Sequence, residues 1–232
     1  MRLDMTDTSL HDVIAEVGPL VEGITGWELG LAEVGCRLIP RGRAFEEVLL
    51  GRLQGMGVAT QALGQSGLAT RLLEYLIEGN VQAAYDPGRG ELLVIHENVD
   101  DSNPDGLRVI VAHELVHRGQ HLHHAELFSR VDRMMGEYLN RVLERGIGIR
   151  DTMRVVNEMQ PLMTLLESHA FYVQESLRAS HYSAARIESH FSLPALLFRL
   201  FGARKLAQYT DGFDAVAEAT ERGAVNELYT GI

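Results

Sequence analysis

The residues of this chain that could do chemistry begin with His113, Glu114 and His117, which form the pattern HExxH. In an α-helix, side chains four positions apart lie on one face, so both imidazoles can reach a single ion. The carboxylate beside the first imidazole can point toward water bound on that ion. This pattern is typical of zinc sites that activate water for hydrolysis. We therefore predict that His113 and His117 are zinc ligands and that Glu114 is a general base.

The sequence around the motif favours a buried helix. Asn103, Pro104 and Asp105 supply an N-cap, a proline for the first turn and an acid for the positive helix end. The residues that follow are apolar almost all round the helix, which predicts burial. A buried polar group without a partner costs about 1–3 kcal/mol, and a metal ion would remove that cost. The alternative is a solvated amphipathic helix that carries the pattern by chance.

A third protein ligand is required, because catalytic zinc usually takes three and leaves the fourth position for water. Glu167 is favoured, since it is one carboxylate in an otherwise apolar helical run, and burying it without a metal or a cation would be costly. Glu167 could instead lie on an exposed stripe or pair with an arginine. His123 and Glu126 are the alternative ligands. His123 has the last position of HExxHxxGxxH, but Gln120 stands where that pattern has glycine.

Several other side chains are candidates for the site. A hydrolase needs a donor for the negative charge that develops on its substrate, and five residues on predicted helices could serve as this donor or support the ligands: His169, Tyr172, His181, Tyr182 and His190. A packed or surface role is the alternative for each, since geometry must decide. His121 and His124 are expected at a solvated helix end, beside the ligands or at the pocket rim, and not as ligands themselves. The single cysteine, Cys36, excludes an intrachain disulfide and is expected to be buried in a strand.

The hydrophobic pattern predicts an α+β fold that is predominantly helical, with a small N-terminal sheet, a central HExxH helix and a helical C-terminal half. Pro161 is expected to interrupt one helix or to begin a new one. Strands are expected at 81–85 and 91–95, joined by a turn into a hairpin. The other expected elements are an extended run at 29–39 and helices at 9–24, 44–53, 68–77, 125–145, 151–180, 183–190, 194–209 and 213–222. Glycines at 55, 57, 64 and 67 could mark mobile backbone.

The composition is that of a soluble globular protein, with 46% hydrophobic and 23% charged residues. A chain of 232 residues fits one domain, 1–232, with a mixed part at 1–100 and a helical part at 101–232 that carries the metal site. A net charge of −11 argues against nucleic acid or an anionic membrane as partner. The sequence shows neither an apolar signal core at its start nor an apolar run of membrane-spanning length, so we expect a cytoplasmic protein.

HExxH followed by a glutamate on a later helix resembles the gluzincin arrangement of the zincin metalloproteases. The sequence at 111–117 and 165–170 is similar to the bacterial zinc-dependent metalloprotease family labelled as associated with coenzyme F420 biosynthesis. The similarity covers 81–124 and 158–178, and this chain has Ser168 and His169 where that family tends to have glycine and an aromatic residue. The resemblance implies a zincin-like fold, Zn²⁺ as cofactor and a peptide or protein substrate.

In zincins, an edge strand ahead of the metal helix binds an extended peptide by strand addition. The strand at 91–95 is the candidate for that role, and an ordinary hairpin that closes the sheet is the alternative.

The sequence thus favours a zinc-dependent hydrolase of peptide or amide bonds. Zinc would lower the pKa of its bound water, and Glu114 would take the proton and return it to the leaving amine. The opposing hypothesis is a non-proteolytic, zincin-like protein that binds metal or regulates a partner. The presence of Glu114 favours catalysis, since a purely structural metal site does not need that base. Hydrolysis of a small amide is a third hypothesis.

Overall fold

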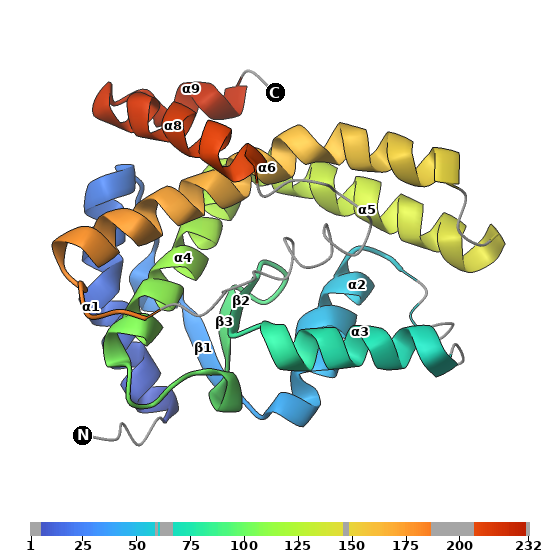
Figure 1. The fold of residues 1–232 in the computed structure, drawn as a ribbon, viewed down its shortest axis with the longest axis horizontal. Coiled ribbons are helices and arrows are strands. Elements are labelled where there is room, and N and C mark those ends of the chain that lie inside the picture. The colour runs from blue at the N-terminus through green and yellow to red at the C-terminus, as the bar shows by residue number, and fades with distance from the viewer. Residues whose placement is uncertain (1–5, 59, 61–66, 146–148, 187–206, 231–232) are drawn as a thin grey trace.

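The computed structural model describes residues 6–58, 60, 67–145, 149–186 and 207–230. These residues form a mostly helical α+β fold with a three-stranded sheet, as the sequence predicts (Figure 1). The strands are β1 (Gly35–Ile39), β2 (Ala83–Asp86) and β3 (Glu91–Ile95). The helices are α1 (Asp7–Thr25), α2 (Gly51–Gly55), α3 (Gly67–Asn80), α4 (Pro104–His123), α5 (Ala125–Arg145), α6 (Ile149–Ser180), α8 (Ala207–Glu221) and α9 (Val225–Thr230). In the described parts of the chain, no helix combines the length and the apolar character that crossing a membrane requires.

The sheet has the strand order β1-β3-β2. β2 and β3 form the predicted antiparallel hairpin, and β1 lies parallel to β3 on its other side. β3 is therefore the central strand and both of its edges are paired. The prediction that 91–95 is an edge strand, available to add a peptide, is wrong. Hydrophobic periodicity indicates which residues are extended, but strand order depends on the crossover that returns the chain from β1 to the hairpin.

Both faces of β3 are buried. Leu92 and Val94 belong to the larger core cluster, which also contains residues of α1, α4 and α6. Leu93 and Ile95 belong to a second cluster, which contains residues of α2 and α3. Burial on both faces explains why β3 is a continuous apolar run instead of an alternating one.

Helix α4 has the start and the environment that the sequence predicts. The side chain of Asn103 accepts a hydrogen bond from the backbone N–H of Gly106, and Pro104 is the first helical residue. Every residue from 109 to 120 is buried. The helix packs against α1, α6 and β2, and it runs through the middle of the molecule (Figure 1). The HExxH motif is thus in the interior of the protein.

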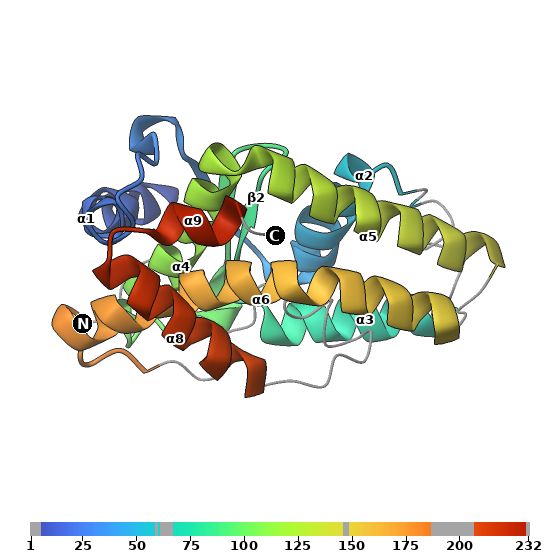
Figure 2. The same cartoon turned by 90° about the horizontal axis from the view of Figure 1, so that it is seen from above.

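Helices α5 and α6 lie side by side as a long antiparallel pair (Figure 2). α6 continues through Pro161 without a break. Pro161 removes one backbone hydrogen bond, and packing against α4, α5 and α8 compensates for it, because its neighbours Leu162 and Met163 are buried. Helices α8 and α9 pack against each other, and α8 also packs against α6 (Figure 2).

Several predicted elements have different boundaries in the structure, and α8 is continuous across residues 210–212, where the sequence predicts a break between two helices. The run at 29–39 contains a 3₁₀ turn, Leu31–Glu33, before β1. The helix at 44–53 begins with a π-helical segment, Phe45–Leu50, and continues as α2. Residues 183 and 184 form a turn and residues 185 and 186 have no regular structure, where the sequence predicts a helix. The remainder of that predicted helix and residues 194–206 lie outside the described residues.

Candidate metal centre

Glu167 lies against both imidazoles of the HExxH motif. Its Oε2 atom is 3.6 Å from Nε2 of His113, and its Oε1 atom is 3.5 Å from Nε2 of His117. The three side chains come from two helices, because α6 packs across α4 at this point. Each residue is at most 5% exposed. The structure therefore brings together the three residues that the sequence indicates as metal ligands.

Each of these two distances is compatible with a small cation shared by the two side chains. Two ligand atoms that each lie about 2.1 Å from a tetrahedral zinc ion are about 3.4 Å apart. The observed separations of 3.5 and 3.6 Å are close to that value. Two imidazoles and one carboxylate are also a donor set that catalytic zinc uses. The motif residues His113, Glu114 and His117 each offer one ligand atom within 4.8 Å of the others.

A hydrogen-bond network sets the orientation of His117. The Nε2 amide of Gln120 donates to the backbone oxygen of Leu166 at 2.8 Å, and a backbone oxygen can only accept. The Oε1 atom of Gln120 must then face His117 Nδ1, which is 2.8 Å away and carries the proton. In the neutral ring, Nε2 therefore has the lone pair and faces Glu167. No residue in the described ranges hydrogen-bonds to this Nε2 atom.

The same network extends to the C-terminal helix. The hydroxyl of Tyr229 on α9 accepts a hydrogen bond from Gln120 Nε2 at 3.1 Å and is hydrogen-bonded to Nδ1 of His169 at 2.7 Å. Burial lowers the pKa of His169 to about 3, and the charges of His117 and His124 add to this effect. Burial also raises the pKa of Tyr229, although its hydrogen bond with Gln120 opposes that shift.

Glu114 is held by the edge of the sheet. Its Oε2 atom accepts a hydrogen bond from the backbone N–H of Tyr85 at 2.8 Å. Tyr85 lies in β2, whose other edge pairs with β3, so this N–H faces α4. The contact fixes the direction of the carboxylate relative to the two imidazoles. β2, and not β3, is the strand that lies beside the centre.

A small cavity lies beside the side chains of Glu114, His117 and Glu167. Its volume is about 20 Å³, which is room for one water molecule. Glu114, His117 and Glu167 contribute to its wall, together with Arg52 of α2. The rest of the wall is largely apolar and comprises Ala84, Tyr85, Phe128, Val131, Met163 and Leu166.

The two alternative third ligands lie elsewhere. His123 is exposed, its ring stacks on Trp27, and its Nε2 atom is 2.9 Å from the backbone oxygen of Glu28. Glu126 is exposed on the first turn of α5. Gly119 has a packing role, because a Cβ there would lie 2.7 Å from the Trp27 ring. The glycine that precedes Gln120 lets α4 approach Trp27 and does not turn the chain back onto the metal.

The four predicted charge-stabilising donors that the structure describes are not in the cavity wall. Tyr172 packs near the Phe213 ring, at 5.5 Å between centroids, and His181 is exposed beside Ser180. The Tyr182 hydroxyl donates to Glu16, and burial raises the pKa of Tyr182 to about 12. His169 is also absent from the cavity wall, but it belongs to the hydrogen-bond network around His117. His190 lies outside the described residues.

His121 and His124 pack against tyrosines near the centre, and Cys36 lies in the sheet. His121 Nδ1 is 3.0 Å from the hydroxyl of Tyr85, and burial lowers the pKa of His121. His124 stacks on Tyr229 with 4.1 Å between ring centroids. Cys36 is buried in β1, as predicted.

Sequence reasoning missed Gln120, Tyr229 and Arg52. In the sequence Gln120 stands out only as a mismatch to another motif, although a buried amide one turn after a ligand histidine is itself a signal. Neither Tyr229 nor Arg52 has a local pattern that marks it. Their relation to the centre depends on how α9 and α2 pack.

Comparisons with known proteins found no match for this chain among family models, curated proteins or solved structures.

Proposed function

We propose that the protein is a zincin-like, gluzincin-type zinc metallopeptidase that hydrolyses peptide or amide bonds. The observation that carries the proposal is the position of the Glu167 carboxylate, 3.6 and 3.5 Å from the two motif imidazoles. A distant carboxylate that meets both rings at the spacing of zinc ligands supports a three-ligand centre. The cavity beside it has the volume of one water molecule, which supports an open fourth position.

His113, His117 and Glu167 would hold the ion in this mechanism. When bound, zinc supplies Lewis-acid polarisation of a carbonyl and a lowered pKa for water. Glu114 accepts the proton of the attacking water and donates it to the leaving amine. Tyr85 orients the Glu114 carboxylate through its backbone N–H, and Gln120 orients His117 through Nδ1. The apolar cavity wall excludes bulk water from these groups.

The substitution Glu114→Gln tests this proposal. The variant should retain one zinc per chain and lose about 100- to 10,000-fold in kcat/KM on a mixed peptide library, because the general base is removed. Zinc content is measured by atomic emission and cleavage by mass spectrometry. Glu126→Gln is the matched control, since Glu126 is exposed on α5, and its activity should equal that of the wild type. Unchanged turnover in the Glu114→Gln variant would remove Glu114 from the mechanism.

A non-proteolytic metal-binding function is the second candidate, and the enclosed shape of the site favours it. A cavity of about 20 Å³ admits water but no peptide, so hydrolysis requires the wall to move. Zinc binding by the wild type without cleavage of either the peptide library or small amides would support this candidate. Cleavage of small amides alone would restrict the substrate to that class.

A further inference from the structure

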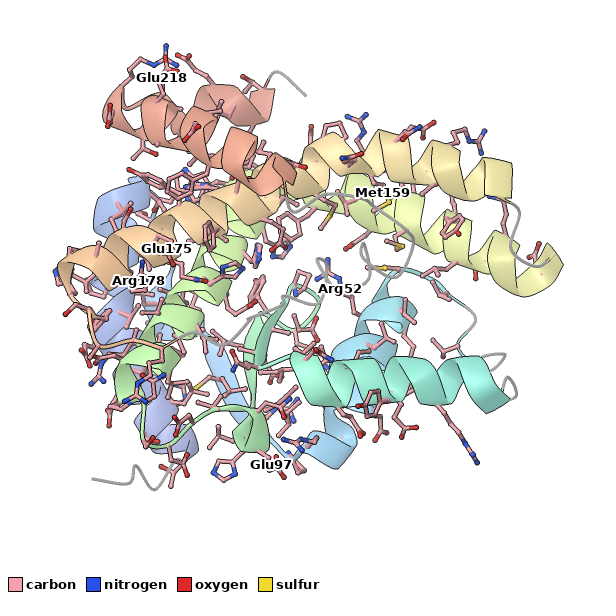
Figure 3. The ribbon with its side chains drawn as sticks, in the orientation of Figure 1. Arg52, Glu97, Met159, Glu175, Arg178 and Glu218 are labelled. Carbon is pink, nitrogen blue, oxygen red and sulfur yellow. The ribbon has the colours of Figure 1, made fainter. Side chains whose placement is uncertain are left out.

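A buried arginine shares the cavity with the candidate metal centre. Arg52 lies on α2 and its side chain is 9% exposed. Figure 3 shows it extending from α2 toward the middle of the molecule. It is the one arginine or lysine among the described residues of the cavity wall, which also includes Glu114 and Glu167. A cation therefore faces the space in which the proposed reaction takes place.

Among the described residues, the guanidinium of Arg52 has fewer hydrogen-bond acceptors than it has N–H donors. Its Nη2 atom donates to Oδ1 of Asp132 on α5 at 3.0 Å. Within the described ranges this is the one hydrogen bond of the side chain, whereas a guanidinium carries several N–H groups. A buried charge is costly unless its hydrogen-bonding groups are satisfied. An acceptor inside the cavity would satisfy the remaining donors.

The form of the cavity indicates the class of that acceptor. A guanidinium is a planar fork that matches a carboxylate with two parallel hydrogen bonds. Most of the surrounding wall is apolar, including Phe128, Val131 and Met163. Once the wall has moved to admit a substrate, this largely apolar surface with one cation would favour a ligand that has an apolar body and one carboxylate.

We propose that Arg52 binds a carboxylate of the substrate and makes the centre selective for peptides that carry one next to the bond to be cleaved. This inference rests on the proposed function. Asp132 accepts from Arg52 in the absence of substrate, and the substrate carboxylate takes its place. The carboxylate comes from a peptide C-terminus or from an acidic side chain, and both present the same group to the fork.

Binding to zinc-loaded Glu114→Gln protein tests the proposal without the need for turnover. The probes are N-acetylated pentapeptide pools in four forms, with a free or an amidated C-terminus and with or without aspartate and glutamate. Peptides retained on ultrafiltration are quantified by mass spectrometry. At least one carboxylate-bearing form should bind about tenfold more tightly than the amidated pool without acidic residues. The form that binds identifies the source. Equal binding of all four pools would overturn the proposal.

Two substitutions on the Glu114→Gln background separate a ligand-binding arginine from a structural ion pair. Arg52→Met should abolish the preference for carboxylate. Asp132→Asn should keep or increase it, because the competing carboxylate is removed. Arg43→Met is the matched control, since Arg43 pairs with Glu47 and is absent from the cavity wall, and it should leave the preference for carboxylate unchanged. If Arg52→Met and Asp132→Asn both lower Tm and leave the preference for carboxylate intact, Arg52 is structural and the proposal fails.

Arg52→Lys covers the case in which the Arg52→Met variant does not fold. Lysine keeps the charge and loses the fork, so the preference should fall several-fold with the circular dichroism spectrum unchanged. If the Arg52→Lys variant kept the whole preference for carboxylate-bearing peptides, binding through the two parallel hydrogen bonds of a guanidinium would be contradicted.

The wild type, incubated with the same pools, distinguishes the two proposals. Cleavage without any preference for carboxylate would overturn the role of Arg52 and leave hydrolysis standing. Carboxylate-dependent binding by the Glu114→Gln protein, with no cleavage by the wild type, would overturn hydrolysis and leave the role of Arg52 standing.

Discussion

Glu47 and Glu167 are two carboxylates with little exposed surface and opposite surroundings. Their side chains are 11% and 5% exposed. Glu47 lies within 3.3 Å of Arg37, Arg43 and Arg89, so permanent cations surround it. Glu167 faces the two motif imidazoles, whose nitrogen atoms can offer lone pairs. One cluster is made of opposite charges, and the other is made of groups that could bind a metal ion.

The difference shows how the surroundings of a carboxylate indicate its role. Burial acts to raise the pKa of Glu47, but the hydrogen bond from Arg37 and the nearby arginine charges outweigh it and keep this pKa below its usual value. That cluster ties the π-helical segment to β1 and to the β2–β3 turn within the chain itself. We infer that the Glu167 cluster is completed by a cation from solution.

The largest expected effect comes from neutralising each carboxylate in turn. Glu167→Gln should weaken zinc affinity at least about 100-fold, since it replaces a charged ligand with a neutral amide. Glu47→Gln should leave the affinity unchanged. Competition with a chromophoric chelator measures both. Equal affinities in the two variants would break the comparison, because Glu167 would then be no more a ligand than Glu47.

A smaller effect is expected from the network that orients the ligands. Tyr229→Phe removes the hydroxyl between Gln120 and His169. Zinc affinity should fall about tenfold, the lower end of the range for partners of metal ligands. The d–d spectrum of the cobalt-substituted protein should also shift, which a purely structural role would not cause. Tyr182→Phe is the control, because its hydroxyl donates to Glu16 away from the centre. The same loss in both variants would indicate general destabilisation.

The smallest effect concerns the pH dependence of the Glu47 cluster. A carboxyl with a depressed pKa contributes stability above the pKa of the unfolded chain, about 4.3, and loses it as pH falls through the lower pKa of the folded protein. Glu47→Gln should therefore cost about 1 kcal/mol or less at neutral pH and nothing at low pH. Urea unfolding at several pH values measures this. A cost that is the same at every pH would show that the charge is not its cause.

Much of the fold is predictable from local pattern. The helices α1, α4 and α5, the β2–β3 hairpin and the buried environment of the motif follow from spacing, caps and turn residues. The central position of β3 and the continuity of α6 through Pro161 do not. Both depend on contacts with segments distant in sequence. Such contacts set the strand order and outweigh the tendency of a proline to break a helix.

The sequence by itself determined the spacing of His113, Glu114 and His117, because helix geometry places residues four apart on one face. It also marked Glu167 as a carboxylate that needed a partner. Only the tertiary structure decided that Glu167 meets both rings, that Arg52 lines the adjoining cavity and that Tyr229 bonds to Gln120. The physical reason is that periodicity is a property of one helix, whereas convergence depends on how separate helices pack against one another.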